Sequence, residues 1–329
     1  MKRRESTTYL TQYAQQVPSL KEYVQQGGYQ GLQEALKLPP EEVRQIVIDS
    51  KLRGRGGAGF PTGKKWATLP SDAAERGTIL VCNADEGEPG TFKDRYIMER
   101  MPYLMLEGLA IAAYAVRAKR IYVYIRGEYP EVAEQLMAAV QAADAQNYLG
   151  DHILGTDFSV SLEIRRGGGS YVVGDETALL SSLMGKRGYP WMKPPFPTER
   201  GAWDLPTIVN NVETIACLPM ILAGGADQFA AIGTVSSPGP KLFSISGAVN
   251  NPGIYEFPMG VTVRDAIIAA GRGKSEYIPL MIETTGVMDA ASFCPFGQSV
   301  STPLRTLLEG FGDEIERFIR EQEYVKEVV

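Results

Sequence analysis

Glycine-rich runs and the charged residues beside them are the parts of this sequence whose residue types could do chemistry. The run 53–65 contains the pattern G-x-G-x-x-G and ends on Lys64 and Lys65. Glycines let backbone N–H groups approach a phosphate or a flat ring, and lysines add cations for phosphate. The run therefore predicts a phosphate or ring site, and the alternative is an exposed surface loop. It is not the standard dinucleotide fingerprint, because a helix is expected before it and Pro61 and Gly63 would interrupt a helix after it.

Acidic residues crowd the next candidate segment, 82–90. It contains Asn83, Asp85, Glu86 and Glu88 and directly follows a predicted strand. Ligands gather at the carboxyl ends of the strands in α/β sheets. This density of acids suits a polar ligand, ribose hydroxyls or a metal ion. The alternative is a solvated acidic turn.

Three later segments add aromatic, cationic and amide groups. Residues 165–177 again follow a predicted strand and combine consecutive glycines with Tyr171, which could stack on a ring. Residues 193–197 form a proline-rich stretch with one cation and one aromatic ring, which alone is most often a plain connector. Residues 210–214 supply amides that could satisfy the polar edge of a flavin or a base.

The elements that position these segments alternate between strand and helix. Short apolar runs predict strands at 78–82 and 121–125, and alternation of apolar with polar residues predicts a half-buried strand at 158–164. Apolar residues at helical spacing predict one helix over 104–116 and another that opens at Pro130. Strands separated by helices of this length predict an α/β fold with a parallel or mixed sheet.

The flanking segments divide the chain further. Residues 1–50 look helical, with a helix start at the prolines before Glu41. A strand, a turn at 250–253, a return strand and a helix over 263–270 indicate a small β-grasp-like module, and the stretch 300–327 is charged and helical. The predicted parts are an N-terminal helical segment at 1–50, a main α/β domain at 51–238, a shortened β-grasp module at 239–282 and a C-terminal helical part at 283–329.

Composition removes several functional classes. The 329 residues include one histidine, so a multi-histidine zinc site is excluded. The three cysteines lie far apart and form no C-x-x-C pair and no disulfide framework, which indicates a reducing compartment. A net charge of −6 disfavours a general nucleic-acid role. No apolar run approaches the roughly 20 residues of a membrane helix and no secretory signal is seen, so we expect a cytoplasmic protein.

Together the five segments resemble the flavin- and NADH-binding subunit (the F subunit) of respiratory NADH:quinone oxidoreductase, or complex I. The same module occurs in diaphorase subunits of NAD-linked hydrogenases and formate dehydrogenases. The matching runs are GRGGAGFPTGKKW at 54–66, CNADEGEPGTFKDRY at 82–96, GGGSYVVGDETALL at 167–180, KPPFP at 193–197 and NNVET at 210–214. The resemblance implies a Rossmann-like α/β domain for flavin and NADH, then a truncated β-grasp (SLBB-like) module and C-terminal helices left from an iron–sulfur domain.

The resemblance also implies roles for individual residues. The positions matching those that hold FMN are Gly54, Gly56, Lys65, Asn83, Asp85, Glu86, Tyr171, Gly174, Asn210, Asn211 and Thr214. Those matching the positions that receive NADH are Gly57, Ala58, Phe60, Glu88, Glu176, Lys193 and Phe196. Arg55, Gly59 and Asp175 complete the expected cofactor-binding set, and we expect Glu88 and Glu176 to be the catalytic carboxylates.

Three features depart from the family pattern. Lys64 stands where the family commonly has an apolar residue. Asp175 stands where the family usually has glutamate. Family members also carry a C-x-x-C-x-x-C run and a later fourth cysteine, which together ligate one [4Fe–4S] cluster, and a single thiolate cannot hold it. Here only Cys294 falls in the fourth-cysteine region, and the three-cysteine run is absent. We expect a natural variant without the cluster or an internal deletion, with Cys294 a small buried hydrophobe rather than a metal ligand.

The function that the resemblance implies is that of an FMN-dependent NADH dehydrogenase. Hydride would pass from the nicotinamide to the flavin, and electrons would pass to a partner redox centre and toward quinone. Glu176 would repel the 2′-phosphate of NADPH. The expected partners are a [2Fe–2S] subunit of the E type and a larger iron–sulfur subunit, in a complex peripheral to the inner membrane. Two alternatives stay open: a non-catalytic assembly subunit, and the diaphorase subunit of a hydrogenase or formate dehydrogenase.

Overall fold

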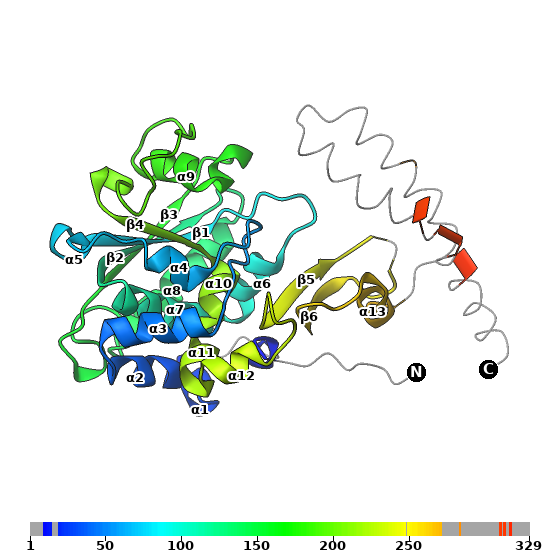
Figure 1. Ribbon diagram of the computed structural model, residues 1–329, viewed down its shortest axis with the longest axis horizontal. Coiled ribbons are helices and arrows are strands. Elements are labelled where there is room, and N and C mark those ends of the chain that lie inside the picture. Colours follow the sequence, from blue (N-terminus) through cyan, green and yellow to red (C-terminus); the bar gives the residue numbers. More distant parts are fainter. Residues whose placement is uncertain are drawn as a thin grey trace. The chain divides into compact units, whose positions relative to one another are not determined.

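Strand-forming residues build a four-stranded parallel sheet with the order β3-β2-β1-β4 (Figure 1). The strands are β1 (Thr78–Ala84), β2 (Ala118–Ile125), β3 (Ser161–Arg166) and β4 (Thr207–Asn211). Leu80 of β1 lies opposite Ile121 of β2 on one side and Ile208 of β4 on the other. The two central strands, β1 and β2, are mostly buried, as expected for a parallel sheet that helices cover on both faces.

The computed structural model describes residues 9–14, 19–247, 249–271 and the isolated residues 283, 309, 310, 312, 313, 316 and 317. The chain divides into two units. The larger unit takes its described residues from 9–14, 19–244 and 256–261, and the smaller unit takes them from 245–255 and from 262 onward. The helices predicted over 300–327 therefore lie almost wholly outside the described residues.

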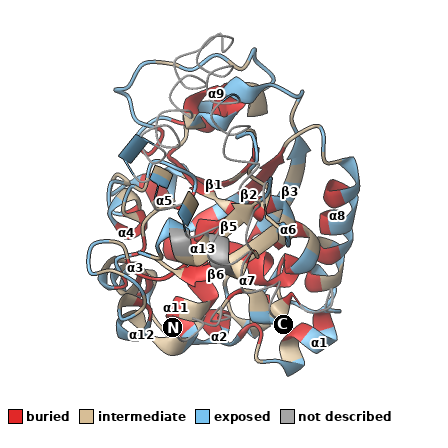
Figure 2. Cartoon of the chain, turned by 90° about the vertical axis from the view of Figure 1, so that its right-hand side faces the viewer, coloured by how far each residue is buried: buried red, intermediate tan, exposed pale blue. Residues whose placement is uncertain are grey.

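Helices cover both faces of the sheet in the larger unit. On one face, α9 (Glu176–Leu183) packs Leu179 and Leu180 against Ile79 and Val81 of β1. On the other face lie α7 (Pro102–Ala115) and α10 (Val212–Ala216), which both contact β1 (Figure 1). Nearly every residue of α7 is buried, as its all-round apolar sequence requires (Figure 2).

Shorter elements complete the larger unit. The helices are α1 (Leu20–Gln25), α2 (Gln30–Leu36), α3 (Pro40–Asp49), α4 (Thr62–Trp66), α5 (Ala73–Arg76), α6 (Lys93–Arg100), α8 (Pro130–Asp144), α11 (Leu218–Gly224) and α12 (Ala226–Ala230). The 3₁₀ turns are η1 (Thr11–Tyr13), η2 (Ile153–Gly155), η3 (Tyr171–Gly174) and η4 (Ala202–Asp204).

A buried carboxylate fastens the N-terminal helices to this unit. Glu107 of α7 is 1% exposed and accepts hydrogen bonds from the Tyr23 hydroxyl at 2.5 Å and from the backbone N–H groups of Tyr29 at 2.7 Å and Leu32 at 3.0 Å. The described part of segment 1–50 thus shares a core with the sheet. The boundary placed at residue 50 stays a prediction.

The sequence-based predictions of element type are confirmed for the strands at 78–82 and 121–125 and for the helices over 104–116 and from Pro130. The strand predicted at 158–164 begins later, at Ser161, because Val160 forms an isolated antiparallel bridge with Gly150 instead. The parallel α/β architecture is confirmed by the register of all three strand pairs.

The predicted hairpin and helix are also present. β5 (Pro240–Ile245) and β6 (Gly253–Pro258) form a two-stranded sheet, and α13 (Val263–Ala269) follows. Within the smaller unit, the N–H groups of Asn250 and Asn251 donate to the carbonyls of Gly271 and Ala270, at 3.2 and 2.8 Å. Among the described residues, no helix has both the length and the apolar character needed to cross a bilayer.

Candidate functional site

The carboxyl ends of the parallel strands bring three of the five predicted segments to one edge of the sheet. The acidic segment follows β1, the glycines at 167–169 follow β3, and Asn210 and Asn211 end β4. The chain runs from β1 to β2 and β3 on one side, whereas β4 pairs with β1 on the other. Ligands in open α/β sheets bind at such a switch in strand order, so the edge between β1 and β4 is the expected site.

The glycine-rich loop joins this edge from the side of α4. Its ends are closed by hydrogen bonds from Gly54 N–H to the Phe60 carbonyl at 2.9 Å and from Thr62 N–H to the Leu52 carbonyl at 2.8 Å. A Cβ atom on Gly56 would lie 3.0 Å from Cβ of Asn211, so the loop backbone packs directly on the end of β4. The tip at 56–58 is exposed, with its backbone available to a ligand.

Two arginines of this loop are engaged by their own chain. Nε of Arg53 donates to the Gly59 carbonyl at 2.6 Å, and Nη2 of Arg55 donates to the Pro238 carbonyl at 2.7 Å. Arg55 N–H also donates to the fully buried Thr214 hydroxyl, at 2.8 Å. Arg55 and Thr214, predicted as cofactor contacts, are thus placed where their side chains hold the loop in position.

The acidic segment holds two carboxyl groups with altered titration. Burial raises the pKa of Asp85 to about 6, and its Oδ2 atom has no hydrogen-bond partner among the described residues. Burial, together with the nearby charge of Asp94, raises the pKa of Glu86 to about 7. The Glu86 carboxylate accepts from the backbone N–H groups of Asp94 at 2.8 Å and Arg95 at 3.0 Å, so it caps the start of α6.

Glu176, the first residue of α9, joins two lysines from distant segments. Lys65 Nζ donates to its Oε2 at 2.7 Å, and Lys193 Nζ donates to its Oε1. Lys65 also donates to the Val209 carbonyl at 3.0 Å. Burial favours a raised pKa for Glu176, but the two lysines outweigh it and hold that pKa below its usual range. The cation predicted for FMN and the cation predicted for NADH therefore share one carboxylate.

Asp175 caps the N-terminus of α9. Its Oδ1 accepts from Thr177 N–H at 2.8 Å, from Ala178 N–H at 3.1 Å and from the Thr177 hydroxyl at 2.6 Å. The shorter aspartate in place of the family's glutamate is well suited to this cap, since aspartate is among the strongest N-cap residues. Asp175 thus fixes the helix that presents Glu176.

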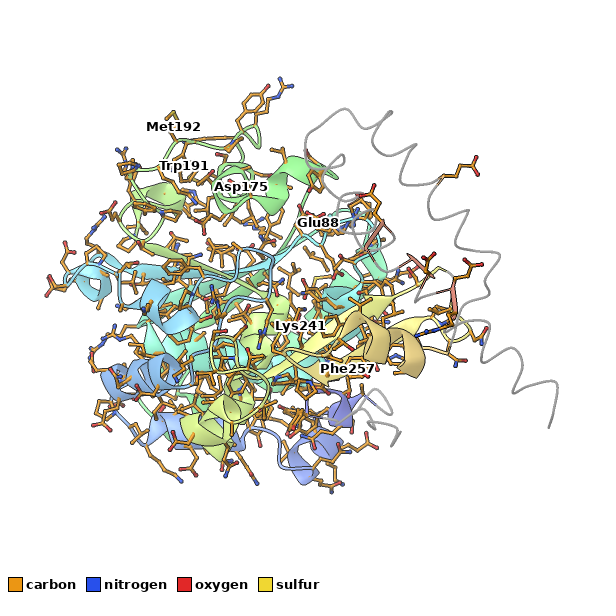
Figure 3. The ribbon with its side chains drawn as sticks, turned by 45° about the vertical axis from the view of Figure 1, so that its right-hand side comes forward. Glu88, Asp175, Trp191, Met192, Lys241 and Phe257 are labelled. Atoms are coloured by element: carbon orange, nitrogen blue, oxygen red, sulfur yellow. The ribbon has the colours of Figure 1, made fainter. Side chains whose placement is uncertain are left out.

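The open side of the site is aromatic and exposed. Tyr171 is 52% exposed, and its hydroxyl donates to Glu88 Oε1 at 2.7 Å. Phe60 and Phe196 are also about half exposed, at 53% and 51%. Figure 3 shows Glu88 and Asp175 in this part of the larger unit, with Trp191 and Met192 on the loop beyond them. Exposed rings can stack on a base, and the carboxylates beside them can accept hydrogen bonds from ribose hydroxyls.

The predicted amides are held by specific partners. Trp66 Nε1 donates to Asn210 Oδ1 at 2.9 Å, and Asn83 Nδ2 donates to the Gly174 carbonyl at 3.0 Å. Gly174 is thereby tied to the end of β1. Asn83 Oδ1 also accepts from the Asp85 N–H at 3.1 Å. These contacts fix the orientation of both amides.

Sequence reasoning missed a buried set of charges next to the site, Lys93, Asp94, Glu213 and Lys241, which we call the buried quartet. Lys93, Asp94 and Glu213 are 7%, 3% and 0% exposed. Nζ of Lys93 lies 2.6 Å from Asp94 Oδ1 and 3.1 Å from Glu213 Oε2, and Nζ of Lys241 lies 2.5 Å from the same Glu213 oxygen. Three members fall inside the matched runs at 82–96 and 210–214, which was the available signal.

The site fits FMN in its donor set and in its space. Buried Asp85 Oδ2 needs a donor, and the ribityl hydroxyls of FMN are donors. A Cβ atom on Gly57 would meet nothing within 4 Å, so the loop tip can approach a phosphate or a ring. Among the described residues, no three histidine, cysteine, aspartate or glutamate side chains gather in a way that could hold a metal ion.

The two described cysteines are not placed as ligands of a [4Fe–4S] cluster. Cys82 and Cys217 are fully buried, and burial raises the pKa of both thiols, to about 12 for Cys217. Buried thiols of this kind are inert core side chains. Cys294 lies outside the described residues. A cluster of this type is held by four thiolates, and the sequence contains three cysteines.

The sheet, its switch point and the glycine loop define an α/β protein with a candidate ligand site at the carboxyl edge of a parallel sheet. Comparison with known families identifies which one. The Nuo51 FMN-binding domain matches residues 47–220, the SLBB domain matches 242–275, and the NADH-ubiquinone oxidoreductase-F iron-sulfur binding region matches 261–318. The chain belongs to the family of the F subunits of NADH-quinone oxidoreductase, which confirms both the resemblance and the predicted fold class.

Individual relatives agree with this family. The NADH-quinone oxidoreductase F subunit of Aquifex aeolicus is 46% identical over 296 residues, which cover 90% of this chain and 68% of the relative. The F subunit of Escherichia coli is 47% identical over 75% of this chain and 56% of its own length. The NADP-reducing hydrogenase subunit HndC of Solidesulfovibrio fructosivorans is 46% identical over 78% of this chain and 52% of its own.

A solved structure gives the same architecture. An NAD⁺-reducing [NiFe]-hydrogenase in the H₂-reduced state aligns with a TM-score of 0.73 and 30% identity, over 95% of this chain and 66% of the other. The chain thus spans between about half and two thirds of the length of these relatives.

Proposed function

We propose that this chain binds FMN and NADH and acts as an FMN-dependent NADH dehydrogenase that passes electrons to a partner redox centre toward quinone. The observation that carries the proposal is the convergence of the glycine loop, the acidic segment, Glu176 and the β4 amides on one sheet edge. FMN, when bound, supplies an acceptor for the hydride of NADH. The protein's contribution is stacking geometry and charge.

The flavin side of the site is assigned to the residues that surround the end of β1 and β4. The backbone of the loop tip would donate to the phosphate, and Asp85 Oδ2 would accept from a ribityl hydroxyl. The amides of Asn83, Asn210 and Asn211 would face the polar edge of the ring. Lys65, held by Glu176, would lie beside them as a fixed positive charge.

The nucleotide side is assigned to the exposed half. Phe60 and Phe196 offer ring faces to the base, and Glu88 and Glu176 offer acceptors to ribose hydroxyls. Glu176 stays ionised because two lysines lower its pKa, so it repels a 2′-phosphate and favours NADH over NADPH. Lys193 pairs with Glu176. When the nucleotide binds, its phosphates could form an ion pair with the same ammonium group.

Reconstitution with FMN tests the proposal. The FMN-free chain is incubated with excess FMN and gel-filtered, and NADH is then added without oxygen. We expect a yellow protein with about one FMN per chain. NADH should bleach its flavin absorbance, and NADPH should do so far more slowly than NADH. A chain that stays colourless would contradict the proposal. A matched variant, Phe60→Ala, should keep the flavin and bleach at a higher NADH concentration.

Two observations support other contexts. The likeness to hydrogenase subunits favours a diaphorase role in an NAD-linked hydrogenase, which would use the same site with a different partner. The count of three cysteines favours an assembly subunit without an electron exit. Bleaching by NADH distinguishes both catalytic roles from the assembly role, and iron analysis tests the absence of a cluster, since about four irons per chain would refute it.

The partners and location are part of the same proposal. The relatives are subunits of larger complexes by name, which supports redox partner subunits here, with a [2Fe–2S] subunit of the E type and a larger iron–sulfur subunit as the expected ones. A cytoplasmic location at the periphery of the inner membrane follows from that assignment. Co-purification of a tagged chain with iron–sulfur subunits would test it.

A further inference from the structure

The amide of Asn211 is surrounded by partners that distinguish its oxygen from its nitrogen. Oδ1 accepts from the Glu213 N–H at 3.0 Å and from Lys93 Nζ at 3.4 Å. Nδ2 donates to Asp94 Oδ2 at 2.5 Å. If the amide rotated by 180°, its NH₂ group would face an N–H and an ammonium, and its oxygen would face a carboxylate. The surrounding charges therefore allow only one orientation.

The two residues that distinguish the amide ends are themselves fixed by the rest of the buried quartet. Lys93 is bound between Asp94 and Glu213. Glu213 is fixed in turn by Lys241 and by the Leu242 N–H, which donates to its Oε1 at 2.8 Å. Figure 3 marks Lys241, which lies on β5. The links from Lys93 to Asp94 and from the Leu242 N–H to Glu213 are buried, and the others are partly buried. Charged hydrogen bonds that are shielded from solvent hold geometry firmly.

The quartet sets two lysines against two carboxyl groups. Burial disfavours the charged form of Lys93, but Asp94 and Glu213 outweigh it and hold the pKa of Lys93 above its usual range. Burial likewise disfavours the charged form of Glu213, but Lys93 and Lys241 hold the pKa of Glu213 below its usual range, whereas burial lowers the pKa of Lys241. Buried ion pairs seldom stabilise a fold more than well-packed apolar side chains would, so their presence here calls for a role in specificity.

We propose that Lys93 and Asp94, held by Glu213 and Lys241, are positioning residues that set the orientation of the Asn211 amide and thereby present a hydrogen-bond donor to FMN. An amide nitrogen carries two hydrogens, and Asp94 takes one. The second is directed away from the quartet. Gly56 packs on Asn211 Cβ, which keeps the glycine loop and this donor in register. The proposal rests on FMN binding at this edge of the sheet.

The substitution Asp94→Asn tests it with little change in volume. We expect FMN affinity of the full chain, measured by quenching of flavin fluorescence, to fall about tenfold, equivalent to about 1.4 kcal/mol. The control is Glu107→Gln, which replaces another buried carboxyl group of the larger unit, one whose hydrogen bonds go to the N-terminal helices. Glu107→Gln should lower thermal stability about as much as Asp94→Asn does, but it should leave FMN affinity unchanged. Wild-type affinity in Asp94→Asn, or an equal loss in both variants, would overturn the proposal.

A second readout needs no FMN and so separates this proposal from the proposed function. In the FMN-free chain with ¹⁵N-labelled asparagine, the Asn211 side-chain NH₂ signal, assigned by its loss in Asn211→Asp, should be shifted downfield and protected from exchange. Both properties should disappear in Asp94→Asn and persist in Glu107→Gln. An Asn211 signal that Asp94→Asn leaves unchanged would refute the positioning role, whether or not the wild type binds FMN.

Discussion

The two halves of the site differ in how far their charged side chains are buried. On the flavin side, the buried quartet has three members less than 10% exposed, and each charge is matched within the protein. On the nucleotide side, Glu176 and Lys193 have side chains that are 21% and 31% exposed. Buried charges are costly to move, whereas exposed ones exchange partners easily. The contrast suits a resident cofactor on one side and an exchanging substrate on the other.

The largest expected effect comes from breaking the buried half. Glu213→Gln leaves Lys93 and Lys241 facing one uncharged side chain without water, and we expect the free energy of unfolding to fall by about 3 kcal/mol. Urea denaturation followed by circular dichroism measures it. Glu176→Gln is the matched control, and it should lose less than about 1 kcal/mol. Equal losses in the two variants would remove the distinction between the halves.

Glu176→Gln should instead change nucleotide selectivity. Without its negative charge, the nucleotide side no longer repels a 2′-phosphate, while Lys65 and Lys193 gain uncompensated positive charge. We expect kcat/KM for NADPH to rise about tenfold relative to that for NADH. Steady-state assays with ferricyanide as acceptor would show it. An unchanged ratio of the two values would remove Glu176 from this role.

Asp85 offers a smaller effect with a defined pH dependence. Burial raises its pKa from 3.8 to about 6 in the folded chain, so its contribution to stability is complete below about pH 4 and is lost as the pH rises through about 6. FMN-free Asp85→Asn should therefore have a Tm roughly 2–4 °C above the wild type at pH 7.5. The difference should vanish at pH 4. A constant difference across this range would contradict the assignment.

The smallest effect is expected from Tyr171→Phe. Its hydroxyl makes an exposed hydrogen bond to Glu88, so stability should change by less than about 0.5 kcal/mol. Loss of this contact frees Glu88 to move, and we expect KM for NADH to rise about twofold with kcat unchanged. A large drop in Tm would show that the open half is as rigid as the buried one.

Much of the fold could be predicted because periodicity reports burial. The strand at 78–82 and the helix at 104–116 could be predicted from their apolar patterns, because nearly all residues of β1 and α7 are buried. The site segments are recognisable as short runs of residues. Such runs could not disclose which side chains pair across more than a hundred positions, as Lys65 does with Glu176 and Lys93 with Asn211.

The same limit applies to two side chains whose partners could not be read from the sequence. The resemblance implies that Arg55 and Thr214 contact the cofactor, and this stays a prediction. In the structure the Arg55 guanidinium donates to the Pro238 carbonyl, and the Thr214 hydroxyl accepts from the Arg55 N–H. The sequence shows that a cation is present, but its hydrogen-bond partner depends on tertiary packing and could not be predicted.

The engagement of Arg53 and Arg55 by carbonyls of their own chain has a consequence for how the loop would bind a phosphate. An exposed arginine attracts an anion through water and is screened as ionic strength rises. Here both guanidinium groups are committed to Gly59 and Pro238, and the loop offers neutral backbone N–H groups at its tip. These two arginines should therefore add little direct contact with a phosphate at the loop tip, whose affinity should depend mainly on the shape of the backbone.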